Sequence, residues 1–155
     1  SAPTTSQVRF SDFKNVEMKA VGISPKFASS GANQKALKKI DKELSENLQM
    51  TLSNFKRLEA GEEFSKTGTR TLQITPNVKE IKFINGAVRF WVGAMAGSSA
   101  VLMQTTFVDS KTGKVIADPE FYRSANVFSG PFGIADNLML DSIARDVSDY
   151  ANYNK

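Results

Sequence analysis

The side chains that most enzymes use for chemistry are scarce in this sequence. Its 155 residues include no His and no Cys, which removes the usual general base, the commonest zinc ligands, thiol nucleophiles and disulfides. Carboxylates such as Asp109, Asp118 and Glu120 remain, but no spacing brings two of them together as glycoside hydrolysis requires. No Ser stands in a nucleophile-elbow pattern, and no loop has the alternating oxygen ligands of a calcium site. We therefore predict a protein that is not an enzyme and has no cofactor and no metal.

A glycine-rich stretch, residues 86–97, is the first candidate for a functional site. It carries Phe90, Trp91 and Met95 with almost no charge, and it lacks the Lys-Ser/Thr pair of a phosphate-binding loop. Two interpretations remain open. The stretch is either a strand and turn packed into the core, or an exposed loop that contacts a partner subunit or a membrane interface, where Trp is common.

A second aromatic cluster follows, comprising Phe121, Tyr122, Phe128 and Phe132. These rings could line a pocket for a hydrophobic or glycan ligand. They could equally close one end of a core, which is the more frequent fate of such side chains.

The charge balance is only mildly basic. Twenty Lys and Arg face 16 Asp and Glu, a formal net charge of +4. The lysines of residues 35–57 are mixed with acidic residues and have no interleaved aromatics for base stacking, so we expect a solvated helix face and no nucleic-acid partner.

The elements that must position these residues follow from hydrophobic periodicity. Residues 32–57 have the spacing of an amphipathic helix, and Ile134, Leu138, Ile143 and Val147 mark a terminal helix. Strands are expected at residues 16–23, 69–83, 99–108 and 114–117, with a bend near Pro76 to Glu80 and a tight turn at residues 109–113.

This order of elements predicts an α/β fold of the α+β sandwich type. One mixed, mainly antiparallel sheet of about four to five strands would carry two amphipathic helices, most simply on one face. We expect a single domain at residues 16–151, a flexible N-terminal tether at residues 1–15 and a frayed tail at residues 152–155.

Several segments together carry a family resemblance. They are NLQMTLSNFKRL and TLQITPNVKEIKF, the small-residue stretch RFWVGAMAGSSAVLMQTTFVDSKTGKVIA, and FGIADNLMLDSIARDVSDYAN near the end of the chain. Over residues 16–150 the chain resembles bacterial envelope lipoprotein domains of uncharacterised families, especially the domain of unknown function family 4410 and its relatives. It is more distantly similar to the CsgG, TolB amino-terminal and PelC types of α/β domain.

The resemblance implies a place in the cell as well as a fold. It implies export, a lipidated Cys upstream of Ser1, attachment at the periplasmic side of the outer membrane, and no catalysis. The expected function is binding or scaffolding in envelope assembly or transport, with an envelope protein partner or a homo-oligomer. Two alternatives are an oligomeric accessory subunit of an export system and a carrier of a hydrophobic or glycan ligand. No membrane-spanning hairpin is evident, so we do not expect a pore.

Overall fold

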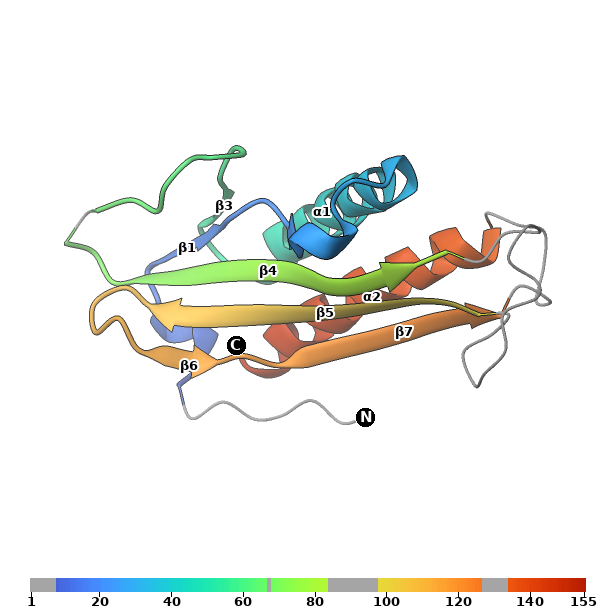
Figure 1. Ribbon diagram of the computed structural model, residues 1–155. Coiled ribbons are helices and arrows are strands. Elements are labelled where there is room, and N and C mark those ends of the chain that lie inside the picture. Colours follow the sequence, from blue (N-terminus) through green and yellow to red (C-terminus); the bar gives the residue numbers. More distant parts are fainter. Residues whose placement is uncertain (1–7, 67, 84–97, 127–133) are drawn as a thin grey trace.

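The structure is a computed structural model that describes residues 8–66, 68–83, 98–126 and 134–155 (Figure 1). A mixed sheet of seven strands forms one layer and two helices form the other. The strands are β1 (Asn15–Met18), β2 (Gly22–Ile23), β3 (Phe55–Arg57), β4 (Thr71–Lys82), β5 (Ser98–Asp109), β6 (Val115–Ala117) and β7 (Glu120–Asn126). The helices are α1 (Gly31–Thr51) and α2 (Ile134–Tyr153), and short 3-10 turns lie at Phe10–Asp12 and Pro25–Phe27.

The sheet is five positions wide although it counts seven strands. Its order is β3-β1-β4-β5-β6, with β2 continuing beside β4 where β1 ends and β7 lying beside β5. The pairings of β1 with β3 and of β1 and β2 with β4 are parallel, whereas β5 is antiparallel to β4, β6 and β7. The predicted fold class is confirmed. The strand number is larger than predicted because β3 and β7 were not predicted as strands and the strand predicted at residues 16–23 is divided into β1 and β2.

The central strand β4 contains the predicted irregularity. Its register with β5 shifts between Val78 and Glu80, which confirms the bend predicted at Pro76 to Glu80. Opposite Pro76, the Thr105 N–H donates to the Pro119 carbonyl oxygen at 3.0 Å and so points away from β4. Pro76 therefore directs its nitrogen away from β5 and towards the break between β1 and β2, where no ladder bond is lost.

Both helices cover the same face of the sheet, as Figure 1 shows for α2 behind β5 and β7. One apolar cluster joins the two helices to alternate residues of the strands, because successive strand side chains point to opposite faces. Its fully buried members include Met18, Ile40, Leu44, Leu48, Leu72, Ile74, Met103, Phe107, Ile143 and Val147.

The first helix ends earlier than its periodicity predicts. It stops at Thr51 and not at Arg57, Asn54 takes a positive φ of 57°, and Phe55 begins β3. Phe55 has helical spacing from Leu52 and Leu48, but its position beside Val16 depends on a strand forty residues away. Tertiary pairing therefore overrides local periodicity here.

Some of the residues expected to lie outside the domain take part in the core. Residues 1–15 were predicted to be a tether, yet Phe10 and Phe13 are 1% and 5% exposed. The Phe10 ring stacks on Phe107 with ring centroids 4.7 Å apart, and the Phe10 N–H donates to the Asn154 carbonyl oxygen at 2.8 Å. Residues 152–155 were predicted to fray, whereas α2 continues to Tyr153 and Asn154 is fully buried.

Candidate functional site

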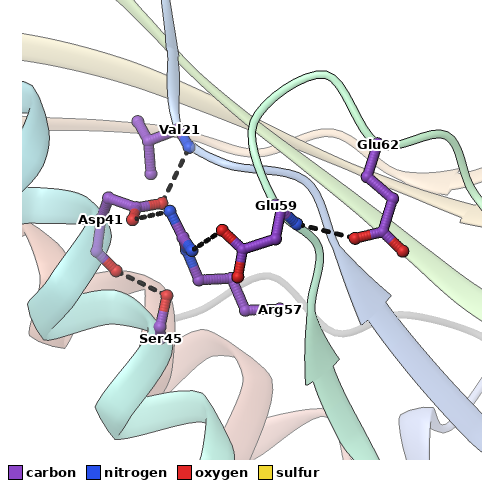
Figure 2. Close-up of polar contacts among 6 residues, drawn as sticks. All are labelled: Val21, Asp41, Ser45, Arg57, Glu59 and Glu62. Carbon is purple, nitrogen blue, oxygen red and sulfur yellow. Dashed lines mark hydrogen bonds and ion pairs between the residues drawn. The ribbon is translucent and has the colours of Figure 1, made fainter.

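The most connected polar cluster lies between α1 and the edge strand β3 (Figure 2). The Arg57 guanidinium and the Asp41 carboxylate approach to 2.6 Å, and the other Asp41 oxygen accepts the Val21 N–H at 3.0 Å. One carboxylate thus joins α1, β3 and the connection between β1 and β2. The Asp41 side chain is only 14% exposed, so water screens this pair less than a surface ion pair.

The electrostatics of this cluster favour the charged form of Arg57. The hydrogen bond from Arg57 to Asp41 raises the pKa of the guanidinium, because ionisation keeps that bond, and burial lowers it by less. The Arg57 Nε is buried and has no hydrogen-bond partner among the described residues. The ion pair between Asp41 and Arg57 holds β3 against α1. A guanidinium held charged is a poor proton donor near neutral pH, so the role of this cluster is structural.

An exposed acidic turn follows β3. The Glu59 N–H donates to the Glu62 carboxylate at 2.9 Å, which lowers the pKa of Glu62, and Lys56 lies 3.5 Å from the same carboxylate. The connector then crosses the outer face of the sheet, where Ser65 donates through its N–H and its hydroxyl to the buried Glu17 at 3.0 Å. The Glu62 and Glu17 carboxylates therefore already accept hydrogen bonds, from the turn after β3 and from Ser65 of the connector.

A third cluster closes the turn between β5 and β6. Asp109 accepts hydrogen bonds from the Arg70 Nε at 3.0 Å and from the Lys111 N–H at 2.9 Å, and the guanidinium of Arg70 lies 4.4 Å from the centroid of the Phe13 ring. Burial raises the pKa of Asp109, but the bonds from Arg70 and the turn amides outweigh it, so the pKa is lowered overall. The turn keeps the structural role that its sequence indicates, with Gly113 at a φ of 72°.

The predicted aromatic pocket is divided by the sheet. Phe121 lies on the helix side, 5.9 Å from Tyr150 in an edge-to-face arrangement, whereas Tyr122 points to the other face and is 51% exposed. These two neighbours on β7 cannot line one pocket, because adjacent strand residues face opposite ways. Phe128 and Phe132 of the same prediction lie outside the described residues, as do Phe90, Trp91 and Met95.

Sequence reasoning did not find the ion pairs that join separate elements. Besides Arg57 and Asp41, Arg123 on β7 binds the Asp146 carboxylate of α2 through two bonds of 2.7 and 2.8 Å. No local spacing indicates these partners, because each pair joins elements that meet only in the folded chain. Salt bridges of this kind orient elements more than they stabilise them when they are half exposed.

Metal binding and membrane crossing are two further properties on which the described part of the chain bears. There, no group of three or more Asp or Glu side chains could hold a metal ion. Within the same ranges, neither helix combines the length and the apolar character that crossing a bilayer requires.

Comparisons with known proteins place the chain in a wider group. A family model described as "Domain of unknown function (DUF4410)" matches residues 8–125. The fold is similar to that of a PelC dodecamer subunit from Paraburkholderia phytofirmans, with a TM-score of 0.63 and 13% identity over 97% of this chain and 95% of that one. It is also similar to the hypothetical protein CT253 from Chlamydia trachomatis, with a TM-score of 0.53 and 13% identity over 91% of this chain and 99% of that one. No curated protein matches the sequence.

Proposed function

The chain belongs to the DUF4410 family, and from this premise we propose that it is a non-enzymatic protein of the bacterial envelope that acts as a homo-oligomeric scaffold. The observation that carries the proposal is the likeness to PelC, a protein solved as a dodecamer, over nearly the whole length of both chains. A shared fold of this extent makes a shared mode of assembly a specific hypothesis, although fold alone does not determine function.

The chemistry of the chain supports a binding role over a catalytic one. It contains no His and no Cys, and its best-connected carboxylates accept bonds from arginines or backbone amides in fixed geometry. Such groups position elements and are not poised to transfer protons. A carrier of a hydrophobic or glycan ligand is the weaker alternative, because Phe121 and Tyr122 lie on opposite faces of the sheet.

Assembly is tested by measuring the mass of the purified chain. Light scattering coupled to size exclusion, repeated over a range of concentrations, should give a defined multiple of 17.0 kDa and native mass spectrometry should give the same subunit number. Trp91→Ala is expected to reduce assembly while circular dichroism stays unchanged, and Tyr153→Ala, which alters an exposed ring on α2, serves as the matched control. A monomer at high concentration would contradict the proposal.

The envelope location needs a separate measurement on the full gene product. We propose a lipid anchor upstream of Ser1 that holds the domain at the periplasmic side of the outer membrane, as expected from the family resemblance. Expression in a bacterial host, with lipid labelling, intact mass and membrane fractionation, should reveal an acylated Cys before Ser1. An unmodified chain in the cytosolic fraction would exclude the anchor and leave the assembly proposal to its own test.

A further inference from the structure

We propose that the connector between β3 and β4 is an acid-released strap, which opens while the rest of the domain stays folded. The strap consists of residues 59–69, and the buried carboxylate of Glu17 on β1 is the group that latches it. The inference concerns a movement within the folded chain, so it goes beyond the proposed scaffold function and does not depend on it.

The two ends of the strap are fixed to the sheet. The connector joins the edge strand β3 to β4 and passes β1, which lies between them (Figure 1). Just before the strap, Leu58 is 1% exposed and its N–H donates to the Met18 carbonyl oxygen at 2.8 Å. Just after it, the Thr71 N–H donates to the Ser110 hydroxyl oxygen at 2.8 Å. Opening is therefore confined to the residues between these two anchors.

The strap has no apolar anchor of its own. None of its described residues is buried, and Phe64 is only partly covered. The Lys19 ammonium lies 5.0 Å from the centroid of the Phe64 ring. Segments with few buried apolar contacts open locally at a small fraction of the free energy of global unfolding. Polar contacts with the sheet must therefore hold the strap closed.

Glu17 provides the shortest of these polar contacts. Its side chain points to the outer face of the sheet, opposite to its buried neighbours Val16 and Met18, and Glu17 is 7% exposed. One Glu17 oxygen accepts both the Ser65 N–H and the Ser65 hydroxyl, each at 3.0 Å. Hydrogen bonds to an ionised acceptor are about twice as strong as those to a neutral one. The closed strap therefore depends on the negative charge of one carboxylate.

The ion pairs of the strap also need ionised carboxylates. They join Lys19 to Glu63 at 3.5 Å, Lys56 to Glu62 at 3.5 Å and Arg57 to Glu59 at 3.9 Å. These pairs are longer and more exposed than the contact with Glu17, so each contributes little alone. All three would weaken together with the Glu17 contact when the carboxyl groups are protonated.

The groups that face Glu17 determine the direction of the pH effect. Glu17 is in register with Lys56 of β3 and Gln73 of β4, and Lys19 shares its face of β1. The strap adds three charged side chains on this side of the sheet, those of Glu62, Glu63 and Lys66. As the pH falls through the range in which carboxyl groups titrate, the acceptors lose their charge and the lysines keep theirs. Closure is therefore complete above that range and is lost as the pH falls.

Hydrogen exchange followed by NMR tests the latch in the 155-residue chain. The Ser65 amide should be protected at neutral pH, and Glu17→Gln, which keeps the shape of the side chain without its charge, should raise its exchange rate about tenfold. The Leu58 and Thr71 amides at the fixed ends should change by less than about twofold. Glu80→Gln, at an exposed carboxylate of β4, is the matched control and should leave the Ser65 amide within about twofold.

A pH titration tests the acid release. The Ser65 amide signal should move between about pH 7 and pH 3 in step with the Glu17 carboxyl signal, and this movement should be absent in Glu17→Gln. Ser65→Ala removes one of the two hydrogen bonds without altering the carboxylate, and it should raise exchange of the amide at position 65 about tenfold. This second variant keeps the test decisive if Glu17→Gln does not fold, which circular dichroism verifies.

Several results would overturn the inference. An unprotected Ser65 amide in the unchanged chain at neutral pH would show that the strap is not latched. Equal increases at Ser65, Leu58 and Thr71 would show that the domain opens as a whole. An equal effect of Glu80→Gln, or a Ser65 signal that does not follow the protonation of Glu17, would exclude this carboxylate as the latch. Assembly is measured separately, so the scaffold proposal stands or fails on its own test.

Discussion

Replacing Phe10 with Ala tests whether the beginning of the described chain is part of the domain. The Phe10 side chain is 1% exposed and contacts two other rings, with centroid distances of 4.7 Å to Phe107 and 6.2 Å to Tyr150. Phe10 belongs to the turn Phe10–Asp12, before the first strand, and Tyr150 belongs to the last helix. Its ring therefore joins the two ends of the chain in one core.

The expected cost follows from burial and from the ring contacts. Truncating a buried Phe to Ala typically lowers the free energy of unfolding by about 3 to 5 kcal/mol, because apolar contacts are lost and a cavity remains. The stacked pair with Phe107 places this site towards the upper part of that range. For a chain of this length, about 4 kcal/mol corresponds to a Tm lower by roughly 8 to 16 °C.

Urea unfolding followed by circular dichroism and fluorescence gives the measurement. Phe10→Ala should shift the midpoint by about 2 M with an unchanged slope, and Ser11→Ala, at an exposed position of the same turn, should change stability by less than about 0.5 kcal/mol. A loss below about 1 kcal/mol for Phe10→Ala, equal to that of the control, would refute the packing of residues 8–15 onto the core.

Three further perturbations have definite signs. Asp109 has a pKa below its ordinary value of 3.8 in the folded chain. The stability that it contributes is therefore present above that value and is lost as the pH falls through the folded pKa. Asp109→Asn should show a smaller acid-dependent loss of the free energy of unfolding between about pH 5 and pH 2 in urea titrations. Thr105 is fully buried and its hydroxyl oxygen has no partner among the described residues, so Thr105→Val should raise the free energy of unfolding by about 1 kcal/mol, and a destabilised variant would contradict this. Gly113→Ala should cost about 1 kcal/mol because φ is 72° there, whereas Gly31→Ala, which meets no atom within 4 Å, should change the Tm little.

Local sequence signals predicted the elements that depend on neighbouring residues. The hairpin of β5 and β6 forms with Asp109 and Gly113 in the roles that turn chemistry assigns them. The core stripe of α1 is also confirmed, because Ile40, Leu44 and Leu48 recur every four residues and are fully buried. These features need no information from distant parts of the chain.

Features that depend on distant partners were predicted less well. Phe55 continued the periodicity of the helix but lies in β3, where it pairs with Val16 of β1. Strand β7 was taken for an aromatic cluster because its strand character comes from pairing with β5. The core of residues 8–15 was missed because Phe10 packs against Phe107 and Tyr150, which are distant from it in the sequence. Strand formation is decided by such contacts more than by intrinsic preference.

The sequence by itself determined that imidazole and thiol groups are absent, the mixed α/β class and the position of its strongest helix, because composition and periodicity are local properties. Only the tertiary structure decided which charges meet. Asp41 and Arg57 come together across α1 and β3, and Ile134 and Leu138 become exposed because the packing of Met139 and Leu140 sets the rotation of α2. This ion pair and the exposed face of α2 depend on how the elements pack together, which the free energy of the whole core determines.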